Sequence, residues 1–206
     1  MAGGGIPQPF AKDGYESSIS RRQNAAVGMM HLERARLDVT FASYDANHDG
    51  MLEREEMTAL LKERNDGVLP DEDEVNFVMR AGVKRQGRPQ SVYRKELDQA
   101  LGQWETCKTM RKSASAAVTT FGQGSDRLTR EGLKESLRQL ASEMGETAEH
   151  ADVTDEELDA ILAEAGMRAK EFTRPEVGLV LRIWQGRVER RRAERSKTKS
   201  RGCILS

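Results

Sequence analysis

The chain has 206 residues and a net charge of −1, and one third of its residues are charged while only 5% are aromatic. This length can bury one large core or two small ones, which excludes a short unstructured peptide. Frequent Ala, Leu, Glu, Arg and Lys favour small helical units over sheets, so we expect an all-α protein.

The charge is unevenly distributed along the chain. Residues 187–201 contain eight Lys or Arg and two Glu. Such a segment suits an anionic membrane surface, whereas no nucleic-acid-reading motif accompanies it, and we expect no nucleic-acid partner. The two cysteines, Cys107 and Cys203, are too few for a disulfide framework, which predicts an intracellular protein. We expect neither a secretion signal nor a membrane-spanning helix.

The first predicted helix follows a segment without apolar periodicity. Residues 1–21 are rich in Gly, Pro and Ser, and we expect them to be disordered. A helix that runs toward Tyr44 is predicted by apolar residues at spacings of four and three, namely Leu37, Phe41 and Tyr44. A second helix after residue 56 is predicted by Met57, Leu60 and Leu61.

A short repeat recurs along the chain. Its six positions hold an apolar residue, any residue, Arg, any residue, Glu or Gly, and a second apolar residue. The copies begin at Leu52, Val92, Leu128 and Phe172. Each copy lies between two amphipathic stretches, which predicts the end of a loop followed by the first turn of a helix. Further helix starts are indicated by N-cap threonines and capping-box pairs at Thr129, Thr173, Asp71 with Glu74, and Thr154 with Glu157.

The loop between the first two predicted helices carries oxygen-bearing side chains at regular positions. In the twelve residues from Asp45 to Glu56, positions 1, 3, 5, 9 and 12 are Asp45, Asn47, Asp49, Glu53 and Glu56. Gly50 stands at position 6, where a sharp turn needs a glycine. This pattern resembles the calcium loop of the EF-hand family.

The resemblance implies one Ca²⁺ site. Its ligands would be the side chains of Asp45, Asn47 and Asp49, the backbone carbonyl of Met51, Glu53 (perhaps through a water) and both carboxylate oxygens of Glu56. His48 points outward in such loops, and His31 and His150 are isolated, so we expect no histidine ligand. The alternative is an acidic surface turn.

Three further loops lack the ligands that the first one has. They are Arg85–Glu96, Phe121–Gly132 and Ala165–Glu176, and we expect none of them to bind Ca²⁺. Their retained apolar frame predicts that the first loop pairs with the second and the third with the fourth. The resemblance to calmodulin-like proteins then covers residues 22–185, with lobes at 22–104 and 105–185; the alternative is an unrelated helical bundle.

Residues 186–206 form the predicted basic tail. The chain ends in Cys203, Ile204, Leu205 and Ser206, which resembles a signal for prenylation of Cys203 by a farnesyl group. Together with the basic residues, one lipid chain would hold the protein at the cytoplasmic face of a membrane, with a soluble pool. The alternative is a chance terminal cysteine. We expect Val177–Trp184 to form the last helix of the fourth unit, with residues from Val188 onward solvated.

These features predict a membrane-tethered calcium sensor or adaptor in signalling. On this hypothesis the first lobe exposes a groove to a target helix, with Met30, Met57 and Met79 as groove candidates. The alternative is a constitutive helical scaffold or a calcium buffer with a structural ion. We expect no enzyme activity, because the chain has no phosphate loop, no nucleophile beside a base and no zinc-ligand spacing.

Overall fold

A computed structural model describes residues 13–82 and 91–202 of the chain, with side chains from Val27 to Arg80 and from Ser91 to Lys197. The described part is mostly helical, which agrees with the expected all-α class, and it contains two short antiparallel strand pairs. Among the described helices, none combines the length and apolar character that a bilayer-spanning segment needs.

The first half of the chain forms three helices and a strand pair. Helix α1 spans Asp13–Tyr44, β1 Met51–Leu52, α2 Arg54–Glu63, α3 Glu72–Gly82, β2 Val92–Tyr93 and the 3-10 turn η1 Arg94–Glu96. Strands β1 and β2 pair antiparallel, with Leu52 opposite Val92. Both of these residues are fully buried, so the pair joins two helix–loop–helix units through an apolar contact.

The second half repeats this arrangement. Helix α4 spans Leu97–Phe121, β3 Leu128–Thr129, α5 Arg130–Glu143, α6 Ala148–Ala151, α7 Asp155–Glu164, β4 Glu171–Phe172 and α8 Arg174–Gly202. Strands β3 and β4 pair antiparallel, with Leu128 opposite Phe172, and both residues are fully buried. The loops therefore pair in the order that the repeat predicts, the first with the second and the third with the fourth.

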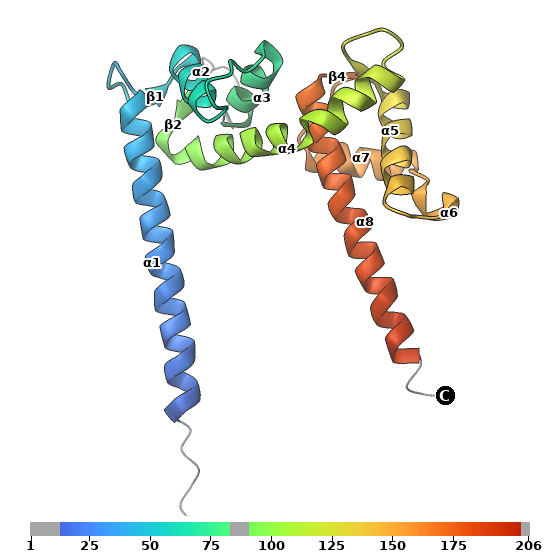
Figure 1. The fold of residues 1–206 in the computed structure, drawn as a ribbon, viewed down its shortest axis with the longest axis horizontal. Coiled ribbons are helices and arrows are strands. Elements are labelled where there is room, and N and C mark those ends of the chain that lie inside the picture. The colour runs from blue at the N-terminus through green and yellow to red at the C-terminus, as the bar shows by residue number, and fades with distance from the viewer. Residues whose placement is uncertain (1–12, 83–90, 203–206) are drawn as a thin grey trace, which may run out of the picture.

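The buried apolar side chains fall into two clusters that share α4. The first core runs from Phe41 to Cys107 and includes Met57, Met79 and Trp104, and we call the elements around it the first lobe. The second core runs from Met110 to Val188 and includes Leu133 and Trp184, and its elements form the second lobe. Figure 1 shows α4 leading from one lobe to the other, with α1 and α8 projecting on the same side.

Two expected boundaries differ from the observed helices. Residues 13–21, expected to be disordered, lie in α1, while residues 1–12 are outside the described part. These turns show no apolar periodicity in the sequence, so this part of α1 was not predicted. Helix α8 also crosses residue 186 without a break.

Val188 corrects the expectation that the chain is solvated from this residue onward. Its side chain is only 1% exposed and belongs to the second core. It follows Trp184 by four residues, so the apolar face of α8 continues one turn beyond the predicted end of the packed helix.

The helix starts indicated by capping patterns are observed. Thr129 and Thr154 each accept a hydrogen bond from the backbone N–H three residues later. Asp71 and Glu74 form the reciprocal pair of a capping box, at 2.7 and 3.1 Å. These local contacts fix where each helix begins, and hence where each loop ends.

Candidate metal centre

The candidate metal loop lies between the end of α1 and the start of α2. Asp45 closes α1, since its N–H donates to the carbonyl of Phe41 at 3.0 Å. The chain then turns through two residues with positive φ, His48 at 57° and Gly50 at 80°. The glycine is required at this point because an L side chain is strained at such a φ value.

The side chains at positions 1 and 3 point into this turn. Oδ1 of Asp45 and Oδ1 of Asn47 both accept from the N–H of Asp49, at 3.1 and 3.0 Å. The second oxygen of Asp45 accepts from the N–H of Gly50 at 3.1 Å. Because two side-chain oxygens lie within 3.1 Å of one nitrogen, they converge inside the loop.

Asp49, at position 5, continues the same cluster. Its Oδ1 accepts from the N–H of Met51 at 2.8 Å, and its Oδ2 accepts from the amide of Asn47 at 3.2 Å. Met51 pairs with Tyr93 in the strand pair, so the backbone at position 7 is held by the neighbouring loop.

Glu56 connects the two ends of the loop. Its Oε1 accepts from the N–H of Ala46 at 2.9 Å, and its Oε2 accepts from the N–H of Glu53 at 3.0 Å. Glu53 itself is exposed at the residue that precedes α2. Glu56 lies in the first turn of α2, next to the buried Met57, so its carboxylate joins the loop to the helix.

The loop carries negative charge that no residue in the described part of the chain neutralises. Asp45, Asp49, Glu53 and Glu56 make no ion pair with any residue that the structure describes. The nearest arginine in sequence, Arg54, instead donates to Asn76 at 2.6 Å. Carboxylates held together without a counter-ion repel one another, which favours binding of a cation.

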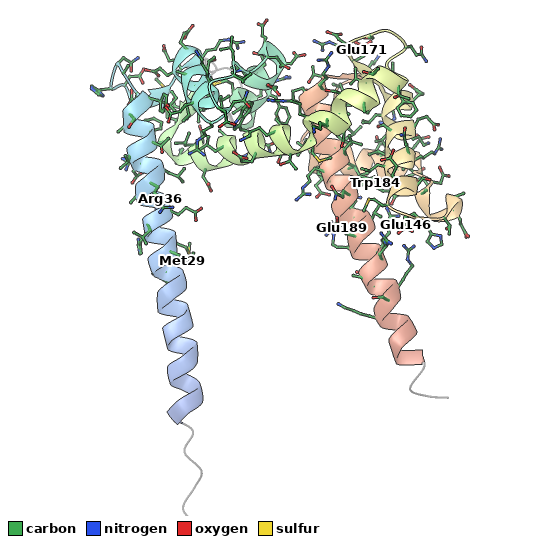
Figure 2. All side chains as sticks on the ribbon, viewed as in Figure 1. Met29, Arg36, Glu146, Glu171, Trp184 and Glu189 are labelled. Carbon is green, nitrogen blue, oxygen red and sulfur yellow. The ribbon has the colours of Figure 1, made fainter. Side chains whose placement is uncertain are left out.

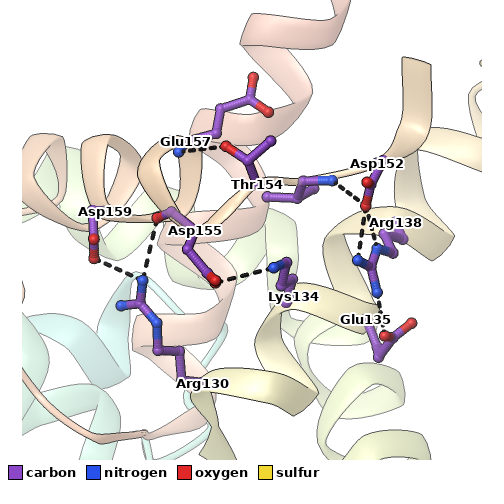
Figure 3. A network of polar contacts seen from close by, with 10 residues as sticks. Arg130, Lys134, Glu135, Arg138, Asp152, Thr154, Asp155, Glu157 and Asp159 are labelled. Atoms are coloured by element: carbon purple, nitrogen blue, oxygen red, sulfur yellow. Dashed lines mark hydrogen bonds and ion pairs between the residues drawn. The ribbon is translucent and has the colours of Figure 1, made fainter. Parts of the chain in front are cut away.

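Three aspartates of the second lobe have cationic partners. Figure 3 shows Arg138 with Asp152, Lys134 with Asp155, and Arg130 with Asp159, and these pairs have distances of 2.7, 3.0 and 2.8 Å. Hydrogen bonds from Arg138 and Lys134 lower the pKa values of Asp152 and Asp155 below the ordinary range. These carboxylates therefore need no added cation.

The donor set of the loop fits a hard cation. It offers carboxylate, amide and carbonyl oxygens, and no nitrogen or sulfur, which suits Ca²⁺ and not the transition metals. Within the described residues, no group of three or more His, Cys, Asp or Glu side chains is already gathered around a common metal position. In this conformation both carboxylate oxygens of Glu56 accept from backbone N–H groups, those of Ala46 and Glu53.

The third loop differs because backbone atoms occupy its closing position. A Cβ atom added at Gly132, where the first loop has Glu56, would lie 2.9 Å from the carbonyl oxygen of Phe121. One added at Gly122 would lie 2.4 Å from the carbonyl oxygen of Val118. The loop has thus closed on its own backbone, and no side chain fits at position 12 without a shift.

The fourth loop keeps its glutamate but pairs it internally. Glu176 accepts from the N–H and the hydroxyl of Thr173, at 2.8 and 2.9 Å. Its other oxygen lies 3.5 Å from the guanidinium of Arg80, which reaches across from the first lobe. In the second loop, Glu96 accepts from the N–H of Tyr93 at 3.2 Å, while residues 85–90 are outside the described part.

The two cysteines stand apart from this loop. Cys107 is a free, buried residue of α4, and burial, together with the nearby charge of Glu74, raises its pKa to about 12. Cys203, the predicted lipidation site, lies outside the described residues.

The three methionines that were predicted to line a groove differ in burial. Met57 and Met79 are fully buried, whereas Met30 is exposed on α1.

Two polar contacts around the loop were not anticipated from the sequence. Asp38 of α1 pairs with Arg94 of η1, and Tyr44 donates to Glu63 of α2. The first pair lowers the pKa of Asp38, and the second raises the pKa of Tyr44. The partners of the first pair are separated by 56 residues, so no local spacing in the sequence could have indicated it.

Comparisons with known proteins do not assign the chain to a family. Neither a protein-family model nor a curated protein matches it. Among solved structures it is similar to a redox protein from Chlamydomonas reinhardtii, with 16% sequence identity and a TM-score of 0.37. The match covers 77% of this chain and 54% of that one, so the chain spans about half of that protein's length.

Proposed function

We propose that this protein binds one Ca²⁺ ion in an EF-hand loop at Asp45–Glu56 and acts as a calcium-responsive binding protein. The observation that carries the proposal is the charge contrast between the loops. Four carboxylates of the first loop have no ion-pair partner among the described residues, while Glu176 of the fourth loop is paired with Arg80.

The geometry around the loop supports this reading. The turn already has the positive φ at Gly50, and the oxygens of Asp45 and Asn47 converge on one N–H. The ion would supply positive charge in place of these N–H donors and would favour rotation of Glu56 toward the oxygens at positions 1, 3 and 5. Asp45, Asn47, Asp49 and Glu56 would hold it, with the Met51 carbonyl and Glu53.

Glu56 is the link from this site to the rest of the lobe. It lies in the first turn of α2, which buries Met57, Leu60 and Leu61 in the first core. A change in the position of Glu56 therefore acts on the packing of α2 against α3 and α1. We propose that this lobe exposes apolar surface to a target helix when the loop is occupied.

The membrane half of the proposal rests on the chain end. Prenylation at Cys203 and the basic residues of α8 would together hold the protein at an anionic membrane surface, because one lipid chain alone binds weakly. The two halves are independent, and either can fail without the other.

A second candidate is a constitutive scaffold or buffer with a structural ion. The full burial of Met57 and Met79 favours it, since these residues form ordinary core in the described conformation. Dye binding separates the two functions, because a sensor gains exposed apolar surface on Ca²⁺ addition and a buffer does not.

Calorimetric titration of the full chain with Ca²⁺ in millimolar Mg²⁺ tests the site. We expect one site with a Kd of about 10⁻⁷ to 10⁻⁵ M for a sensor, weakened about a hundredfold by Glu56→Gln, which removes the closing carboxylate. Glu176→Gln is the matched control, and it should leave the titration unchanged. Absence of heat, or equal effects of the two substitutions, would contradict the site.

A further inference from the structure

The basic segment at the end of the chain is part of a packed helix. On α8, Trp184 and Val188 are buried in the second core, and Arg191 and Arg195 follow at spacings of three and four. This spacing places all four on one face of the helix. The face that buries apolar side chains in the first half of α8 therefore presents arginines in the second half.

These arginines pair with acidic residues of the second lobe. Arg187 lies 2.6 Å from Glu164, and Arg191 lies 3.1 Å from Glu157. Arg195 donates to both oxygens of Glu146, at 2.5 and 2.6 Å, and Arg192 lies 3.6 Å from the same carboxylate. Figure 2 shows Glu146 beside α8, on the same side of the helix as Trp184.

The contacts around Glu146 and Trp184 anchor the helix firmly. The side chain of Glu146 is only 6% exposed, so its carboxylate is shielded from water, while its partners Arg192 and Arg195 remain partly exposed. Arg192 also donates to the carbonyl of Met144 at 2.7 Å. The guanidinium of Arg191 lies 4.6 Å from the ring centroid of Trp184, and this indole donates to the carbonyl of Leu137 at 2.9 Å.

Other basic residues of α8 face away from the lobe. Arg190 and Lys197 are seven residues apart, which places them on one helix face, and both are exposed. In the described part of the chain neither forms an ion pair with the lobe; Arg190 donates only to the carbonyl of Gly186 in its own helix. The basic segment is thus divided into a lobe-facing group and an outward group.

We propose that Glu146, Glu157 and Glu164 compete with an anionic lipid surface for the lobe-facing arginines of α8. The outward residues, Arg190 and Lys197, remain to attract the membrane while the helix is docked. The inference rests on the membrane half of the proposed function and not on calcium binding. Its physical basis is that each Lys or Arg near an anionic leaflet contributes up to about 1 kcal/mol, and a paired arginine contributes less.

Vesicle binding of the full chain without its lipid tests the competition. The probe is vesicles of phosphatidylcholine with about 30% phosphatidylserine, compared with phosphatidylcholine alone, at low salt. Glu146→Gln releases Arg192 and Arg195, and we expect partition onto the anionic vesicles to rise about five- to thirtyfold, the factor that two basic residues correspond to.

Glu149→Gln is the matched control, because Glu149 lies three residues from Glu146, is exposed and forms no ion pair among the described residues. It changes the net charge by the same amount without releasing an arginine. A rise much larger for Glu146→Gln than for Glu149→Gln supports the competition. Equal rises would show that only net charge matters and would overturn it.

Removal of basic residues gives an independent readout. In the otherwise unchanged chain, Arg192→Gln combined with Arg195→Gln should reduce vesicle partition less than Arg190→Gln combined with Lys197→Gln. The opposite order would overturn the assignment of the two groups. Tryptophan emission, which comes from Trp104 in the first core and Trp184 in the second, reports whether each variant keeps both cores folded.

The outcomes separate this inference from the calcium site. If the wild-type chain and all variants bind anionic and neutral vesicles equally, the lipid partner is wrong, whatever the titration of Glu56→Gln shows. If Ca²⁺ does not bind but Glu146→Gln raises partition of the protein onto anionic vesicles, the competition for the arginines is supported and the proposed calcium site is contradicted.

Discussion

The first and fourth loops both end in a glutamate at position 12, but the two residues have different partners. Among the residues that the structure describes, Glu56 is held by backbone N–H groups, and the other carboxylates of its loop have no ion-pair partner. Glu176 is satisfied by Thr173 and by Arg80 from the other lobe. The comparison teaches that a glutamate at the closing position is not sufficient for a metal site, because a cationic side chain of the same chain can pair with it.

The same contrast extends to the two lobes. In the second lobe, Arg and Lys side chains neutralise Asp152, Asp155 and Asp159, and the third loop has closed around Gly132. These three aspartates are thus neutralised within the chain, whereas the first lobe has one loop whose carboxylates lack an ion-pair partner among the described residues. Three predictions sharpen or break this contrast.

The largest expected effect is that calcium stabilises only the first lobe. With millimolar free Ca²⁺ and a micromolar Kd, binding raises the free energy of opening of the lobe by about 4 kcal/mol. Hydrogen exchange measured with Ca²⁺ and again after chelation should show slower exchange at Leu60 and Leu61 of α2. The matched residues of the second core, Leu133 and Leu137, should not change, and equal slowing in both lobes would break the comparison.

The next prediction concerns the closed third loop. Gly132→Ala should lower the free energy of unfolding of the second lobe by about 1 to 3 kcal/mol, because the added Cβ meets the carbonyl oxygen of Phe121 at 2.9 Å. Gly102→Ala in α4 is the control, since nothing lies within 4 Å of its added Cβ. That substitution should stabilise by about 0.5 to 1 kcal/mol. Chemical denaturation measures both, and a neutral Gly132→Ala would contradict the closure.

The smallest expected effect is the acid sensitivity of the second lobe. The pKa values of Asp152 and Asp155 are depressed by Arg138 and Lys134, so their contribution is present above the unfolded pKa of about 4. It is lost as the pH falls through the lower folded-state pKa. Thermal unfolding should therefore show no loss from these pairs between about pH 5 and 7. Arg138→Gln should weaken the dependence below about pH 4, and an unchanged acid profile would count against these pairs.

Much of the candidate site is readable from the sequence because its determinants are local. The oxygens of Asp45, Asn47 and Asp49 lie within five residues, and the turn at Gly50 follows from one glycine. The strand pairs follow from the repeated apolar residues, since each must be buried against another copy. The pairing of Glu176 with Arg80 could not be predicted from the sequence, because these two residues approach one another only through the packing of the two lobes.

The sequence by itself determined the helical class, the pairing of the loops and the positions of the oxygen-bearing side chains, since periodicity and short spacings encode them. Only the tertiary structure decided how the charges are paired. Glu146 meets Arg195 across 49 residues, and Asp38 meets Arg94 across 56. Such contacts depend on the angles at which helices pack, and these angles are set by the shape of both cores and not by any local pattern.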